Sequence, residues 1–143
     1  MVLRGIDIMS PEGAKFGTAI NCMDGRTQLP VIEWMRSRFR VSYVDMITEP
    51  GVDAVLAKND DPRTIEAMKR KVRISIEKHG SRLIVVAGHY DCAGNPVDMR
   101  AHLAQIRSAV KTIASWGFKA EVFGAWVGEH WNVDLEIPLE RRT

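Results

Sequence analysis

Three residues of this sequence have side chains and spacings suited to binding one metal ion. Its two cysteines are Cys22 and Cys92, and His89 stands three residues before the second of them. Thiolate sulfur and imidazole nitrogen are preferred ligands of Zn²⁺ in proteins. Two cysteines in 143 residues are too few for the disulfide framework of a small secreted domain. We therefore predict a metal site formed by Cys22, His89 and Cys92.

A carboxylate and a guanidinium, those of Asp24 and Arg26, follow Cys22 in the segment CMDGR. Three protein ligands leave one position open on a tetrahedral ion, which is typical of catalytic zinc. Asp24 could fill that position with an oxygen, and the site would then be non-catalytic. Two further interpretations stay open. Both cysteines could be simple buried thiols, with Asp24 capping the next helix, or they could form a redox pair, although such pairs usually lie in a C-x-x-C loop.

Apolar runs and helical periodicities alternate along the chain, as in α/β proteins. Four short segments are predicted strands because they are apolar or rich in β-branched and aromatic residues: Lys15–Asn21, Arg40–Ile47, Leu83–Ala87 and Ala120–Val127. Three segments between them have the apolar spacing of helices: Leu29–Phe39, Pro62–His79 and Val97–Trp116. A last segment, Val133–Ile137, alternates strictly and is a candidate antiparallel edge strand.

These elements predict one α/β domain over residues 1–143. We expect a mainly parallel four-stranded sheet of order 2-1-3-4 with helices on its faces. Ligands of such sheets bind beyond the carboxyl ends of the strands, where the strand order reverses. Cys22 directly follows the first strand, and His89 and Cys92 follow the third. These two strands are neighbours in the expected order, so the three side chains should converge.

Composition excludes several classes of function. Twenty Lys and Arg against eighteen Asp and Glu give a net charge of +2, and the charges are interspersed. A nucleic-acid-binding protein usually carries a stronger basic footprint. No apolar stretch is long enough for a membrane-spanning helix, and the N-terminus lacks the apolar region of a secretory signal. We therefore expect a cytoplasmic protein that binds neither nucleic acid nor membrane.

Two motifs of the sequence resemble those of the β-class carbonic anhydrases. The segment CMDGR at residues 22–26 matches their C-x-D-x-R motif, and GHYDCAG at residues 88–94 resembles their H-x-x-C segment with its flanking glycines. The order and separation of the motifs also fit, and the resemblance spans roughly Phe16 to Trp126. It implies a zinc-dependent lyase that hydrates CO2 to bicarbonate by metal-bound hydroxide.

The resemblance also implies roles for the individual residues. Cys22, His89 and Cys92 would hold the zinc, and Asp24 and Arg26 would be catalytic residues beside it. In the family the aspartate accepts a hydrogen bond from zinc-bound water, or ligates zinc in a closed, inactive form, and the arginine draws it off the metal. A homodimer or higher homo-oligomer is implied as well. Two thiolates acidify a bound water less than three imidazoles do, so we expect activity to favour alkaline pH. A rate unchanged between about pH 6 and pH 9 would contradict this.

The sequence departs from the family pattern in two places. Little precedes the first strand, so we expect the N-terminal helical arm of the family to be absent or short. Residues Thr48 to Val52 stand where many relatives carry an R-N-A-G-N-like segment, so we expect the substrate pocket to differ. Relatives with the same zinc motifs hydrolyse carbon disulfide or carbonyl sulfide. A hydrolase of such a CO2-like molecule and a non-catalytic zinc protein, with Asp24 as fourth ligand, are therefore the alternatives.

Four further residues receive individual predictions. His102 is expected to be a solvated residue on the surface of the third helix. Residues 88–94 are called the metal-binding loop below, after its predicted role. Asp91 is expected to hold this loop by accepting hydrogen bonds from backbone amides. Trp126 and Trp131, near the last strand, are expected in core or subunit contacts and are the better candidates for a subunit interface.

Overall fold

The computed structural model describes residues 13–140 of the chain, which form a five-stranded sheet in the order β2-β1-β3-β4-β5. The strands are β1 (Phe16–Asn21), β2 (Tyr43–Thr48), β3 (Leu83–His89), β4 (Glu121–Val127) and β5 (Val133–Pro138). Strand β1 pairs in parallel with β2 and β3, and β3 pairs in parallel with β4. Strand β5 is antiparallel to β4 at the edge. The predicted α/β fold, the order 2-1-3-4 and the antiparallel edge strand are thereby confirmed.

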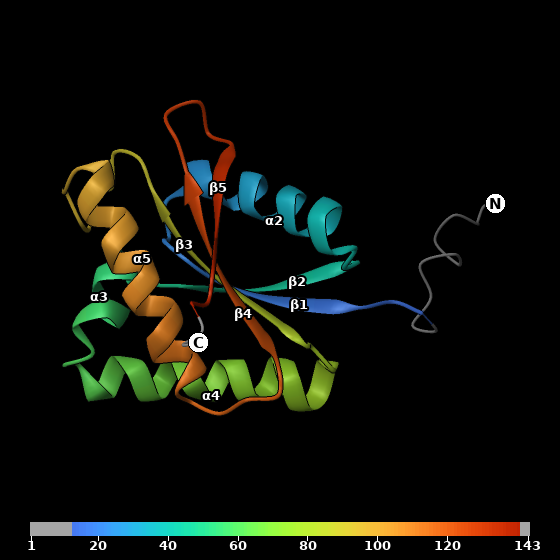
Figure 1. Ribbon diagram of the computed structural model, residues 1–143. Coiled ribbons are helices and arrows are strands. Elements are labelled where there is room, and N and C mark those ends of the chain that lie inside the picture. Colours follow the sequence, from blue (N-terminus) through green and yellow to red (C-terminus); the bar gives the residue numbers. More distant parts are fainter. Residues whose placement is uncertain (1–12, 141–143) are drawn as a thin grey trace.

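Helices cover both faces of the sheet (Figure 1). Helix α2 (Gly25–Phe39) lies on one face, and α3 (Val52–Lys58), α4 (Pro62–His79) and α5 (Met99–Ala114) lie on the other. Each face encloses its own cluster of buried apolar side chains. Both ends of α4 are capped, because Asp61 accepts a hydrogen bond from the amide of Thr64 and Gly80 ends the helix with a left-handed backbone.

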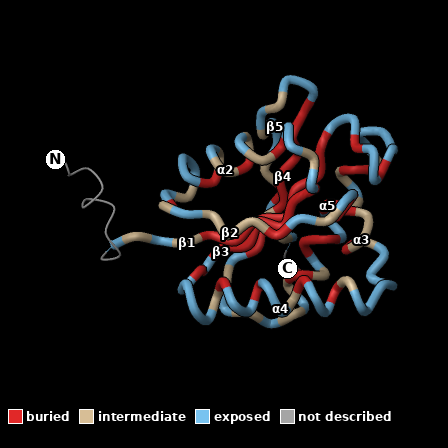
Figure 2. Tube along the Cα trace, turned by 180° about the vertical axis from the view of Figure 1, so that it is seen from behind, coloured by how far each residue is buried: buried red, intermediate tan, exposed pale blue. Residues whose placement is uncertain are grey.

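The central strands are the most deeply buried part of the molecule (Figure 2). All seven residues of β3 are buried, as are five of the six residues of β1. A strand with helices on both sides needs apolar residues on both faces, which accounts for the run LIVVA in β3. Because β1 and β3 are held inside the sheet, the residues that follow their carboxyl ends occupy fixed positions.

Two helices differ from the prediction. Helix α2 begins at Gly25 rather than at Leu29, because the side chain of Asp24 accepts a hydrogen bond from the amide of Arg26 and caps the helix one turn earlier. Pro30 therefore lies inside the helix, where its missing N–H removes one backbone hydrogen bond. The short helix α3 was not predicted, and it begins directly after Gly51, whose backbone is left-handed.

Two expectations from the sequence concern membranes and the N-terminus. No helix within residues 13–140 combines the length and apolar character needed to span a membrane. The expectation of an absent or short N-terminal arm falls on residues 1–12, which lie outside the described residues.

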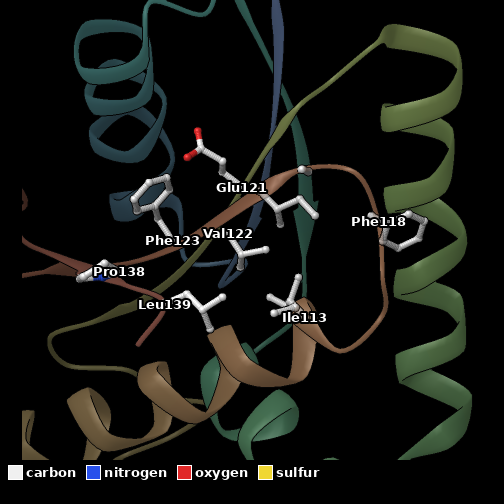
Figure 3. A pocket seen from close by; sticks show the side chains of 10 residues that line it. Ile113, Phe118, Glu121, Val122, Phe123, Pro138 and Leu139 are labelled. Atoms are coloured by element: carbon white, nitrogen blue, oxygen red, sulfur yellow. The ribbon is translucent and has the colours of Figure 1, made fainter. Parts of the chain in front are cut away.

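A pocket of about 400 Å³ (Figure 3) is lined by residues from the beginnings of β3 and β4, at the opposite end of the sheet from the carboxyl ends of β1 and β3. It forms where α5 ends and β4 begins, and its lining includes Ile113, Phe118, Val122 and Leu139. Glu121 is the one charged residue among the described residues of this lining. With neither cysteine nor histidine, the pocket offers no set of ligands for a metal ion.

Candidate metal centre

The three predicted ligands meet at the carboxyl ends of β1 and β3. Cys22 follows the last residue of β1, His89 is the last residue of β3, and Cys92 lies in the loop after it. Their ligand atoms all lie within 4.8 Å of one another, and all three residues are buried. The two sulfurs are 4.0 Å apart. Two thiolates on one tetrahedral zinc ion would be separated by about 3.8 Å, so the cysteines are already spaced for such an ion.

The imidazole of His89 is oriented as a ligand. Its Nδ1 lies 2.7 Å from the carbonyl oxygen of Tyr90, so Nδ1–H is the donor and Nε2 carries the lone pair. Nε2 is buried and has no hydrogen-bond partner among the described residues. Buried polar atoms are normally satisfied. A metal ion held with Cys22 and Cys92 would satisfy this atom, so these residues fit the cofactor that the resemblance implies.

The two thiols differ in acidity. Burial opposes ionisation of Cys22, but the His89 ring, when it is protonated, and the backbone amides of Gly51 and Asp24 outweigh burial and lower the pKa of the thiol to about 7. Burial and the neighbouring Cys22 raise the pKa of Cys92 to about 11. The pair therefore favours one thiolate beside one thiol, and binding of a cation would release the second proton.

Two glycines bring the loop after β2 against the metal-binding loop. Gly51 has a φ of +56°, and a Cβ atom there would lie 2.6 Å from the carbonyl oxygen of Gly94. A Cβ atom on Gly94 would in turn lie 2.8 Å from the backbone nitrogen of Gly51. Only glycine allows this approach, which keeps the amide of Gly51 beside the sulfur of Cys22.

We expect Gly51→Ala to weaken both folding and metal binding. A left-handed backbone costs a residue with a Cβ atom about 1–2 kcal/mol, and the collision with a backbone oxygen adds to this. The free energy of unfolding, measured by urea titration, should fall by more than about 2 kcal/mol. Gly80→Ala is the matched control, because Gly80 has a φ of +72° but no atom within 4 Å of a Cβ position. Equal losses in the two variants would show that the collision is unimportant.

The carboxylate of Asp24 is held by Arg26. Arg26 Nε donates to Oδ1 at 3.1 Å and Nη2 donates to Oδ2 at 2.8 Å, which makes a two-point ion pair. The hydrogen bonds from this guanidinium lower the pKa of Asp24 to about 2. Asp24 does not belong to the group of ligand atoms that lie within 4.8 Å of one another. The carboxylate thus lies close to the cluster without joining it, and it is ionised at neutral pH.

A buried polar network behind the metal-binding loop was not predicted. His102 Nδ1 donates to Asp53 Oδ2 at 2.6 Å, and Asn95 Nδ2 donates to Asp53 Oδ1 at 3.1 Å. Asp53 also lies against Gly88, where a Cβ atom would come within 2.5 Å of Oδ2. The network therefore contacts the residue before His89 and the loop after Cys92. It joins the metal-binding loop to α3 and α5.

The expectation of a solvated His102 is wrong, because the residue is only 1% exposed. Position 102 lies four residues before Ile106 and continues the stripe of buried positions formed by Ile106, Val110 and Ile113. The helical spacing could therefore have revealed its burial. Asp53 accepts the proton of Nδ1, whereas Nε2 of His102 is buried without a hydrogen-bond partner among the described residues.

His102→Ala should destabilise the fold much more than His79→Ala. Both histidines pair through Nδ1 with an aspartate, at 2.6 Å for Asp53 and 2.7 Å for Asp45, but His79 is 43% exposed. Removing one partner of a buried hydrogen bond costs about 1–3 kcal/mol, whereas an exposed pair contributes less than about 1 kcal/mol. Thermal and urea unfolding of the two variants would measure this difference. An equally small loss of stability in His102→Ala and His79→Ala would mean that the buried pair of His102 and Asp53 does not support the metal-binding loop.

Two other expectations need correction. The Asp91 carboxylate accepts a hydrogen bond from Arg26 Nη1 at 3.2 Å rather than bonds from backbone amides of the described residues. Trp126 is 3% exposed and packs against the His102 ring, so it is a core residue and not a subunit contact. Trp131 is partly buried and lies over the guanidinium of Arg26, with 4.2 Å between the guanidinium carbon and the ring centroid, and its place at a subunit interface stays a prediction.

Comparison with known families agrees with this geometry. The model of a family described as "Putative carbonic anhydrase" matches residues 12–136 of the chain. Comparison with curated proteins gave no match. The matched range contains both segments that supply the cluster, and it runs from before β1 into β5.

Proposed function

The chain belongs to this carbonic anhydrase family, and from this premise we propose that it hydrates CO2 to bicarbonate with zinc held by Cys22, His89 and Cys92. One observation carries the proposal: two sulfurs and an unpartnered, buried Nε2 atom already lie within 4.8 Å of one another at the end of the sheet. Three protein ligands leave a fourth position for the reacting molecule.

The residues around the cluster have distinct tasks in this proposal. Zinc held by the three ligands would supply a water acidic enough to act as a nucleophile near neutral pH. The two thiolates and the imidazole would hold the zinc ion. The hydrogen bond from His89 Nδ1 to the Tyr90 carbonyl keeps Nε2 directed toward the two sulfurs. Asp24, kept ionised by Arg26, would accept a hydrogen bond from the attacking water and orient it toward the carbon of CO2.

Stopped-flow measurement of CO2 hydration by the zinc-loaded protein tests the proposal. We expect a rate above that of the buffer between about pH 7 and pH 9, rising toward the alkaline end. A zinc-loaded, folded protein with no rate above the buffer anywhere in this range would overturn the assignment.

Hydrolysis of carbonyl sulfide or carbon disulfide is the second candidate. A pocket of about 410 Å³ lies beside the cluster; its surface is mainly apolar, although its lining includes Asp91 and Asp98 as well as Cys92, Val97 and Trp126. An apolar lining suits small uncharged molecules of this kind as well as CO2. Release of sulfide from either compound, measured in parallel with CO2 hydration, would separate the two activities.

We also infer a cytoplasmic location, a homo-oligomer and a single domain over residues 1–143. A reducing compartment keeps thiols available for a metal, which suits the two free cysteines of the chain. Large apolar side chains near the cluster are solvent-exposed, with Met23 at 62% and Leu29 at 66% exposure, and a second copy could cover them. Light scattering of the zinc-loaded protein would measure the assembly.

A further inference from the structure

The guanidinium of Arg26 is held on three sides. Asp24 occupies one side through the two hydrogen bonds described above. On another side Nη1 donates to Asp91 Oδ2 at 3.2 Å, and Nη2 donates to the backbone carbonyl of Asp91 at 3.1 Å. The ring of Trp131 covers the face of the guanidinium at 4.2 Å. Three segments far apart in the sequence therefore converge on this one side chain.

Arg26 needs such support because it is exposed. Its side chain is 47% accessible, and an exposed ion pair is weak on its own because water competes for both charges. A flat aromatic ring against the guanidinium adds a cation–π attraction and shields that face from water. The bonds to Asp91, which lies between His89 and Cys92, also tie the guanidinium to the metal-binding loop.

We propose that Trp131 and Asp91 are positioning residues, which hold Arg26 on Asp24 and thereby keep the Asp24 carboxylate from occupying the fourth position of the metal. The inference rests on the metal binding in the proposed function, but it does not require that CO2 is the substrate. Asp24 lies two residues from Cys22 and is held by Arg26 at 2.8 and 3.1 Å, so a carboxylate released from Arg26 would compete with any small molecule for the same position.

Anion binding to the Co²⁺-loaded protein tests this competition without any turnover. Azide is the probe, because it binds an open coordination position and changes the visible absorption of Co²⁺. The observed affinity falls in proportion to the fraction of molecules in which the position is free. For Trp131→Ala we expect the azide dissociation constant to rise about two- to fivefold. Trp131→Phe keeps an aromatic face and should restore most of the wild-type affinity.

Trp116→Ala is the matched control, because Trp116 is also half-buried and also lies beside a cation, Lys69, but not at the metal-binding loop. Its azide affinity should equal that of the wild type. Asp91→Asn provides an independent variant, since asparagine tolerates the positive φ of 55° at this position. It should weaken azide binding in the same direction as Trp131→Ala.

The double variant Asp24→Ala, Trp131→Ala tests whether Trp131 acts through the Asp24 carboxylate. If Trp131 acts by restraining Asp24, removal of the carboxylate abolishes the effect, and the double variant binds azide as tightly as Asp24→Ala alone. Unchanged azide affinity in Trp131→Ala and Asp91→Asn would overturn the inference. It would also be overturned if Trp131→Ala weakened azide binding equally in proteins with and without the Asp24 carboxylate. A failure of CO2 hydration in wild-type protein with these azide results intact would overturn only the proposed function.

Discussion

Cys92→Ser should strongly reduce zinc binding, because Cys92 is one of the three members of the cluster. A serine hydroxyl stays protonated near neutral pH and is a poor ligand for zinc. The variant therefore keeps only one sulfur and the imidazole as ligands in the cluster. Changes to groups that merely support metal ligands lower the metal affinity about 10- to 100-fold. Loss of a ligand itself should therefore lower the zinc affinity by more than about 100-fold. Zinc content after dialysis and competition with a chelator would measure it. The wild type should keep about one zinc ion per chain.

A second pair of variants controls for indirect effects on the fold. His89→Ala should lose zinc as Cys92→Ser does, whereas His79→Ala, at a half-exposed histidine paired with Asp45, should keep it. Circular dichroism would show whether each variant is folded. A folded Cys92→Ser protein that retains a full equivalent of tightly bound zinc would rule out this cluster as the metal site.

Asp24→Ala and Arg26→Ala should keep zinc and lose activity. A positioned group that accepts a proton or orients the nucleophile contributes about 10²- to 10⁴-fold to rate, so we expect kcat/KM to fall by at least about 100-fold in Asp24→Ala. The kcat/KM of Arg26→Ala should also fall, because this substitution frees the Asp24 carboxylate, whose Oδ2 lies 2.8 Å from Arg26 Nη2. Stopped-flow kinetics together with zinc content of each variant would measure both properties.

The matched control for this pair is Asp61→Ala. Asp61 caps α4 as Asp24 caps α2, so both variants lose a helix cap, which is worth about 1 kcal/mol of stability. Asp61→Ala should have wild-type activity. If Asp24→Ala instead lost zinc while Asp61→Ala kept it, Asp24 would be a permanent ligand, and the non-catalytic alternative would be favoured.

The features that position the site were predictable because they depend on buried strands. The run LIVVA is typical of a strand covered on both faces, and the carboxyl end of this strand carries His89. The similar end of β1 carries Cys22, and the parallel order places the two ends side by side. Hence the convergence of the three ligands follows from residue order, and the family match agrees with the resemblance of the two motifs.

The features that the sequence did not reveal depend on contacts between distant segments. Helix α3 has only seven residues, too few to show a clear periodicity, and it is held by packing against α5. The earlier start of α2 follows from the Asp24 cap, which the sequence indicated only as part of the alternative with two buried thiols, while the apolar pattern of the helix begins later. The contacts of His102 with Asp53 and of Arg26 with Trp131 join residues far apart in the chain, so no local pattern indicates them.

X-ray absorption spectroscopy of the zinc-loaded protein tests the central claim most directly. We predict two sulfur ligands at about 2.3 Å and two nitrogen or oxygen ligands at about 2.0–2.1 Å, with the same spectrum in Asp24→Ala. That combination identifies Cys22, Cys92 and His89 with a fourth position that the protein leaves open. A zinc ion with fewer than two sulfur ligands, or a light-atom ligand lost in Asp24→Ala, would contradict the account.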